Sequence, residues 1–207
     1  MFPFLTGFMI LIIVLAVLRA RATRSEKERT DAFWEKENAA NSARKVDLST
    51  ISYYEFHPEG LPAAPEQNPD LTDAYDAIVA ASQKQMLNLN GISNTDLKLT
   101  YGPQNLDALT TYGDHFSELE EALLSYGTLL HEEGYLKESI AVLEKGILLP
   151  TDLTQNYIRL ADYYEEAGKS TKKTDLLALA EKNLKGIALS TVRRHLNPEA
   201  ETPDKDH

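Results

Sequence analysis

Apolar residues recur three or four positions apart through most of residues 69–196, a spacing that predicts helices and not strands. The same stretch is rich in Leu, Ala, Glu and Lys, which are strong helix formers. A helix is expected to begin at Pro69, because a proline fits the first turn, and to end near Gly91. A short helix over 94–100, stopped by Gly102, should follow. The pattern therefore predicts an all-α domain.

Further helices are predicted in the C-terminal half. Ser117 and Glu120 form a capping-box pattern, in which each side chain bonds a free backbone N–H, so a helix is expected from there to Glu133. Its return partner and two more apolar-periodic stretches come next. The last stretch should bend or break at Gly186, because glycine is a poor helix former. The three ranges are 135–149, 153–167 and 171–196.

Residues 116–180 resemble themselves when shifted by 34 positions, which is a signature of repeat architecture. Gly127 and Ala161 occupy equivalent positions inside the expected helices. A glycine there costs about 1 kcal/mol relative to alanine, so close packing of a neighbouring helix is expected to compensate. The pattern predicts two helical hairpins. The aligned pairs are Leu123 with Tyr157, Tyr126 with Leu160, Gly127 with Ala161, Leu130 with Tyr164, Gly134 with Gly168, Leu143 with Leu177 and Gly146 with Ala180.

These residues resemble the tetratricopeptide repeat (TPR) family, whose 34-residue unit has large residues, a Leu-Gly pair and a Tyr in its first helix. The second copy departs from the family pattern in its second helix, at Lys173, Thr174 and Leu184. The resemblance implies a TPR-like right-handed stack of antiparallel helical hairpins. It also implies that the first helices line a groove for an extended or helical peptide. An unrelated helical bundle is the alternative.

Nine residues would line that groove if the resemblance holds, because they flank the packing stripe of each first helix. The set is mainly acidic, and only Arg159 has a charge suited to a carboxylate, so we expect a basic or apolar peptide as partner. The alternative is that these positions face water or the linker. They are Leu124, Thr128, His131 and Glu132 from one hairpin, and Gln155, Ile158, Arg159, Asp162 and Glu165 from the next.

The charge of the 207-residue chain is unevenly distributed, with a net charge of −11. Residues 19–45 hold 8 Lys or Arg against 5 Asp or Glu, whereas residues 46–207 hold 13 against 27. An acidic domain repels nucleic-acid phosphates, so we expect no DNA or RNA partner. The chain has no cysteine, which excludes disulfides and thiolate metal sites.

Residues 1–18 contain no charged side chain. As a helix they would span about 27 Å, close to the roughly 30 Å of a bilayer's hydrocarbon core, so a transmembrane anchor is predicted. Basic residues begin at Arg19 and none precedes it. The positive-inside bias therefore predicts a single-pass protein with its N-terminus outside and its domain in the cytoplasm. An extracytoplasmic domain, or secretion after cleavage at the small-x-small sequence 20–22, are the alternatives.

Three segments surround the predicted domain. Residues 19–47 should continue as a basic helix, with Phe33 and Trp34 in a satellite core or against a partner. Residues 48–68 contain too many prolines for a helix and are expected to cross the domain surface, with an aromatic side chain pinned in a groove. A disordered tether is the alternative. The polar tail 197–207 is expected to be disordered.

No motif in the sequence predicts catalysis. His131 is followed by two glutamates, but the second histidine of a zinc-protease motif is absent. There is no phosphate-binding loop, dinucleotide fingerprint or nucleophile elbow, and no metal or cofactor is expected. We therefore expect a non-enzymatic, membrane-tethered scaffold or adaptor that binds a protein or peptide. The alternative is a structural accessory subunit of a membrane complex.

Overall fold

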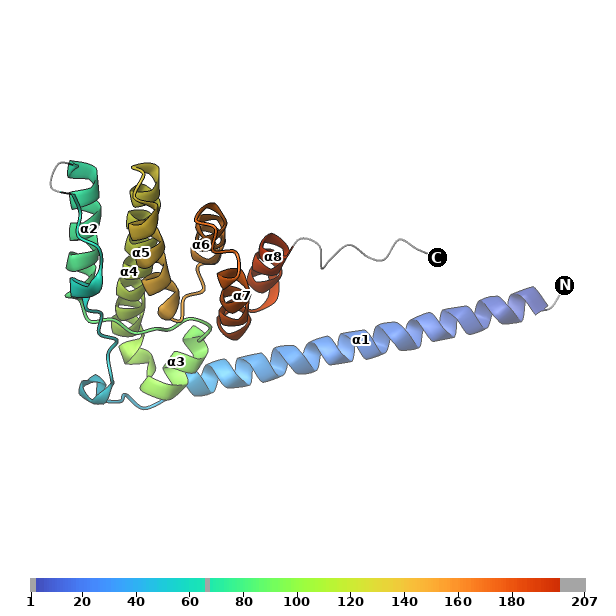
Figure 1. Ribbon diagram of the computed structural model, residues 1–207. Helices are drawn as coiled ribbons and strands as arrows, with labels where there is room; N and C mark the ends of the chain where they lie inside the picture. Colours follow the sequence, from blue (N-terminus) through green and yellow to red (C-terminus); the bar gives the residue numbers. More distant parts are fainter. Residues whose placement is uncertain (1–2, 66–67, 198–207) are drawn as a thin grey trace, which may run out of the picture. The chain divides into compact units, whose positions relative to one another are not determined.

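The computed structural model describes residues 3–65 and 68–197, without the side chains of residues 3–7 and 10–13 (Figure 1). The described chain is all-helical, and its one extended contact is an antiparallel bridge between Tyr54 and Met86. Short 3-10 turns lie at Leu48–Thr50, Pro58–Gly60 and Pro103–Asn105. The α-helices are α1 (Pro3–Asn41), α2 (Pro69–Ser82), α3 (Asn94–Tyr101), α4 (Leu106–Glu132), α5 (Leu136–Leu148), α6 (Thr154–Glu166), α7 (Lys172–Asn183) and α8 (Gly186–Leu196).

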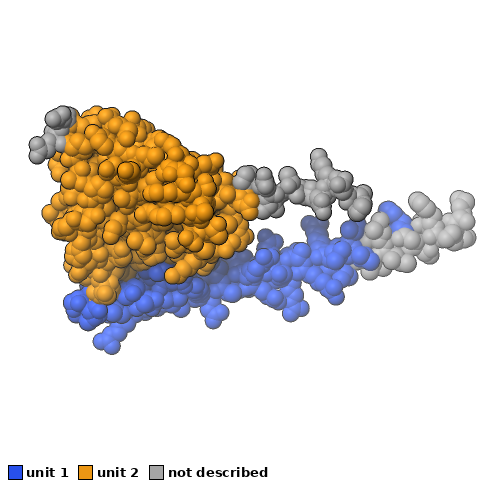
Figure 2. Space-filling model, viewed as in Figure 1, with its two compact units in different colours: residues 1–50, 92–107 blue, residues 51–91, 108–207 orange. Residues whose placement is uncertain are grey.

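The chain divides into two compact units, which Figure 2 shows in different colours. Unit 1 comprises residues 1–50 and 92–107, and unit 2 comprises residues 51–91 and 108–207. In unit 1, α3 packs against the C-terminal end of α1. Lys36 Nζ donates to Asp96 Oδ1 at 2.7 Å, and Ala40 is fully buried.

Phe33 and Trp34 do not form the satellite core that the sequence predicted. Both side chains are exposed, at 55% and 57%, and they contact each other edge to face with ring centroids 5.3 Å apart. Both lie in α1 N-terminal to the buried Ala40. The interpretation as core residues is therefore wrong.

The anchor predicted at residues 1–18 lies largely on residues outside the description, and it remains a prediction. Over the part of the chain whose side chains are described, no helix combines the length and the apolar character needed to cross a membrane.

Unit 2 holds two apolar clusters. The first lies between α2 and α4 and includes residues of the segment before α2. The second lies between α5, α6, α7 and α8. Their largest fully buried side chains are Tyr126 in the first cluster and Tyr157 in the second.

The proline-rich segment docks on unit 2 where it is described, as the sequence predicted. Tyr54 N donates to Met86 O at 2.8 Å, and the Tyr54 ring contacts Phe116 edge to face at 5.2 Å. Farther along, the Tyr126 hydroxyl donates to Pro62 O at 2.9 Å. A disordered tether does not describe this part of the segment.

Two helix boundaries differ from the prediction. α4 begins at Leu106, so Ser117 is an interior residue and the capping box is wrong. Leu109 and Phe116 extend the buried stripe of α4 through that point, which explains the continuous helix. α2 ends at Ser82 and not near Gly91, because the chain must turn back to reach the bridge at Met86.

The small residues of the repeat lie inside helices and are buried, as predicted. A Cβ added at Gly127 would lie 2.6 Å from Leu143 Cδ2, so α4 and α5 are in close contact there. The Gly127 backbone carbonyl accepts a hydrogen bond of 2.6 Å from Ser139 Oγ. Ala161 is fully buried in the second cluster. The predicted break before α8 is also confirmed, because the backbone is extended at Leu184.

Candidate functional site

α4, α6 and α8 of unit 2 are joined by two histidine–carboxylate pairs. His131 Nε2 of α4 lies 2.6 Å from Glu166 Oε2 of α6. His195 Nε2 of α8 lies 2.6 Å from Asp162 Oδ1 of α6. The paired residues are 35 and 33 positions apart, close to the 34-residue shift of the sequence. These pairs therefore join α4 to α6 and α6 to α8, between residues that lie about one 34-residue shift apart.

The exposed side of α6, with its two histidine partners, is the candidate binding surface and is called here the α6 face. At its centre the His131 ring stacks on Tyr163, with centroids 4.0 Å apart and an interplanar angle of 9°. Burial raises the pKa of the Tyr163 hydroxyl, and the nearby Arg159 guanidinium opposes that shift. The α6 face comprises His131, Gln155, Arg159, Asp162, Glu166 and His195.

Several residues predicted to line the groove are occupied by contacts within the molecule. Leu124 packs against the second apolar cluster. Thr128 Oγ1 donates a hydrogen bond to the Leu124 backbone carbonyl at 2.8 Å. Asp162 is bound to α8, as described above. Glu165 accepts a 2.7 Å hydrogen bond from Lys173, which lowers the pKa of the Glu165 carboxyl. These contacts orient the side chains and reduce the acidic charge that a ligand would meet.

The other predicted residues differ in exposure. Gln155, Arg159 and Glu132 are exposed, whereas Ile158 is half-buried. Arg159 is thus an exposed cation on this face. The exposed residues of the predicted set thus carry both signs of charge, with Arg159 and Glu132 exposed.

A buried polar cluster was missed by reading the sequence. The Glu120 side chain of α4 is 3% exposed, and its Oε1 has no hydrogen-bond partner among the described residues. Burial raises the pKa of this carboxyl to about 7, against the opposing influence of Thr151 and Asn90. Thr151 is itself fully buried, and its carbonyl accepts a hydrogen bond from the Tyr157 hydroxyl at 3.3 Å. Glu120 and the exposed Glu121 are neighbours in the middle of α4, and only tertiary packing, which the local pattern does not show, distinguishes them.

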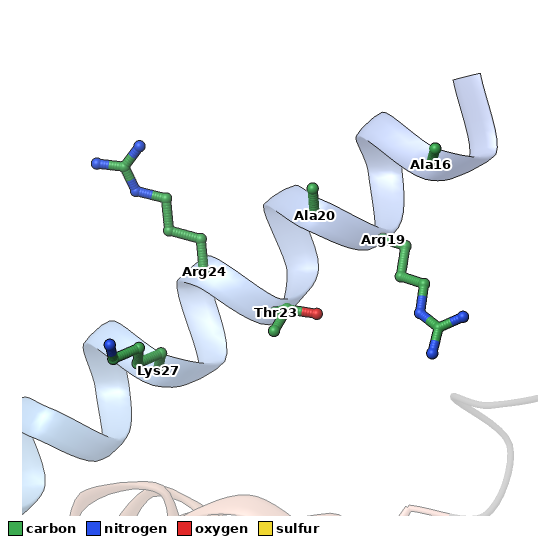
Figure 3. A pocket seen from close by; sticks show the side chains of 6 residues that line it. All are labelled: Ala16, Arg19, Ala20, Thr23, Arg24 and Lys27. Atoms are coloured by element: carbon green, nitrogen blue, oxygen red, sulfur yellow. The ribbon is translucent and has the colours of Figure 1, made fainter. Parts of the chain in front are cut away.

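Among the described residues, hollows also lie away from the α6 face. One belongs to unit 2 and lies between residues 53–57 and 82–85, beside the Tyr54–Met86 bridge. Another lies along α1 in unit 1, and Figure 3 shows that its six lining residues all come from that helix. Arg19 and Arg24 project to different sides of it. A hollow bounded by one helix cannot enclose a ligand, so it is a helix flank and not a binding site.

Neither a search for metal-binding residues nor a comparison with known proteins assigns a function to the site. Within the described ranges, no three His, Asp or Glu side chains lie close enough to hold a metal ion. Comparison of the chain with protein-family models, with curated protein sequences and with solved structures finds no match.

Proposed function

We propose that this chain is a membrane-tethered adaptor of the TPR type, which binds a segment of a partner protein across the α6 face. One observation carries the proposal. The pairs His131–Glu166 and Asp162–His195 join α4, α6 and α8 at separations of 35 and 33 residues, which supports reading these helices as the first helices of successive repeats. Side-by-side first helices are the surface on which helical-repeat proteins receive extended ligands. No catalytic step is assigned to the chain.

The proposed ligand is a basic segment with apolar side chains. Residues 46–168, which include α4 and α6, hold 5 Lys or Arg against 21 Asp or Glu. Glu121 and Glu132 of α4 are exposed and form no ion pair with another described residue. A field of this sign attracts cations and accelerates their encounter with the surface. Arg159 would bind a backbone carbonyl or an acidic position of the ligand.

The tether is proposed to be residues 1–18, with the domain in the cytoplasm. Its support is the uncharged segment followed by basic residues from Arg19 onward. The chain has no cysteine, so the substitution Ser125→Cys, at an exposed position of α4, gives a unique site for labelling. A membrane-impermeant maleimide should label that cysteine only after the cells are opened. Labelling in intact cells would place the domain outside and contradict the proposed topology.

Proximity labelling from the full-length chain in its membrane tests the binding surface. The variant Gln155→Ala/Arg159→Glu changes two exposed residues of the α6 face. Lys137→Ala, an exposed residue on the second helix α5, is the matched control. We expect partners to be lost from the first variant and kept by the control. An unchanged set of labelled proteins would contradict the proposal and favour an accessory subunit held by its apolar segment.

A further inference from the structure

The two ends of the helical stack in unit 2 have opposite charge. α2 lies at one end of the stack and α8 at the other (Figure 1). Residues 169–197, which include α7 and α8, hold 7 Lys or Arg against 2 Asp or Glu, in a chain with a net charge of −11. The charge reverses where the stack ends, which makes the two ends electrostatically complementary.

The outer side of α8, called here the α8 face, is exposed and partly apolar. Ile187 is 85% exposed, the largest exposure among the described large apolar side chains. Lys185, two residues before it, and Arg194, two helix turns after it, are exposed and form no ion pair with another described residue. Ser190 completes the surface between Ile187 and Arg194.

Helix stability alone does not explain the α8 face. A cation near the C-terminal end of a helix is favourable, which accounts for Arg194. Lys185, however, precedes the first turn of α8 as its N-cap residue, where a cation is unfavourable. Terminal units of helical stacks also carry polar outer faces, and Ile187 departs from that rule. Both departures indicate a surface that another element covers.

The outer side of α2, called here the α2 face, complements it. Asp70, Asp73 and Asp76 are exposed and form no ion pair with another described residue. Ala77 and Ala80 are exposed one turn farther along and leave a flat apolar area. Asp76 lies beyond the first turn, so the helix dipole does not account for it.

We propose that the α8 face of one copy of this chain docks on the α2 face of a second copy, head to tail. Ile187 and Arg194 are seven positions apart on α8, and Ala80 and Asp73 are seven positions apart on α2, about 10.5 Å in each case. Antiparallel packing therefore places Ile187 on Ala80 and Arg194 beside Asp73. Such a contact leaves one free face at each end, so it produces rings or open chains.

Charge reversal tests this contact in the full-length chain, held in a non-ionic detergent. One variant is Lys185→Glu/Arg194→Glu and the other is Asp73→Lys/Asp76→Lys. Lys137→Glu on α5 is the control, because it changes an exposed lysine outside both faces. Sedimentation velocity measures association at about 50 mM and about 500 mM salt, where screening differs strongly. Far-UV circular dichroism checks that each variant is folded.

We expect the unaltered chain and the control to associate at low salt and dissociate at high salt. Each double variant should associate at least about tenfold more weakly, and an equimolar mixture of the two should associate again, because both contacts are then complementary. Folded variants that stay monomeric when mixed would overturn the proposal. So would a monomeric unaltered chain, including one whose α8 face binds vesicles of anionic lipid.

Discussion

The α4–α5 and α6–α7 hairpins share one spacing but pack their small residues differently. In the first, Gly127 leaves no room for even a methyl group beside Leu143, and its carbonyl is bound by Ser139. In the second, the equivalent Ala161 is a fully buried methyl group. The equivalent positions of the two hairpins thus allow helix contacts of different closeness. The two hairpins have a small residue at the same position of the first helix. How closely the second helix approaches that residue depends on the side chains that face it.

The strongest test of this difference is a double-mutant cycle in the first hairpin. Leu143 is fully buried, so Leu143→Ala should lower the free energy of unfolding by about 2–5 kcal/mol. Gly127→Ala alone should be destabilising, because its methyl group overlaps Leu143. In the Leu143→Ala background it should instead stabilise by about 1 kcal/mol, through better helix propensity. Urea unfolding of the full-length chain in detergent measures all four free energies.

A matched control is Leu177→Ala, the equivalent position in α7. Leu177 is half-buried, so its truncation should cost less than that of Leu143. If Gly127→Ala has the same effect in both backgrounds, the close contact between α4 and α5 is refuted.

The buried carboxyl is a second difference between the hairpins, because Glu120 aligns with the half-exposed Thr154. The Glu120 pKa is raised from 4.5 to about 7 by burial. At pH values below the pKa of the unfolded chain, the Glu120 carboxyl is protonated in both the folded and the unfolded chain. The folded chain then buries no charge there, and its stability is highest with respect to this group. As the pH rises to about 7, the folded chain must bury an anion. The free energy of unfolding should therefore fall by about 3 kcal/mol over this range and level off above it.

The substitution Glu120→Gln should remove that part of the pH dependence and make the chain more stable than the unaltered chain at pH 8. Urea unfolding between pH 5 and 8 measures it. Glu121→Gln, at the exposed neighbouring position, is the control and should leave the slope unchanged. Equal slopes in the unaltered chain and in Glu120→Gln would show that this carboxyl titrates normally.

A smaller effect is expected in the second hairpin. Ala161→Gly should cost about 1–2 kcal/mol, the sum of a lost helix-favouring residue and one buried methyl group. The direction is the same as for Gly127→Ala, but the cause is the opposite, since one site loses volume and the other gains it. Thermal unfolding followed by circular dichroism measures the change. Stabilisation by Ala161→Gly would mean that this site is as crowded as Gly127.

The smallest effect is expected from the pairs that join the first helices. The side chains of His195 and Asp162 are 38% and 49% exposed, and water screens such pairs strongly. Asp162→Asn should therefore change the free energy of unfolding by less than about 1 kcal/mol. A loss of several kcal/mol would show that the α6–α8 contact depends on this pair and not on the apolar cluster.

Local periodicity was sufficient to predict α5, α6, the α7–α8 break and the buried positions of the repeat. It failed where a distant residue decides the outcome. Met86 fits the stripe of a longer α2, yet it pairs with Tyr54, which lies 32 positions earlier and terminates that helix. Ser117 and Glu120 have the letters of a capping box, but the buried residues on either side keep them inside α4.

For the candidate site, the sequence predicted which helices hold the residues but not the contacts that those residues make. Spacing placed His131, Asp162 and Glu165 on the first helices correctly. Their partners Glu166, His195 and Lys173 depend on how neighbouring helices dock, and no local pattern encodes that. Several charged side chains of the predicted groove are therefore paired with other residues of the same chain.

The central claim is that α6 lies beside α4 on one side and beside α8 on the other, joined by the two histidine–carboxylate pairs. Because the chain has no cysteine, pairs of introduced cysteines can test it without background. The substitutions His131→Cys/Glu166→Cys and Asp162→Cys/His195→Cys should each give efficient intramolecular cross-linking with a short bis-maleimide in the full-length chain. His131→Cys/His195→Cys, which joins helices two repeats apart, should give none. Cross-linking of this last pair, or failure of either of the first two in a folded chain, would contradict the account.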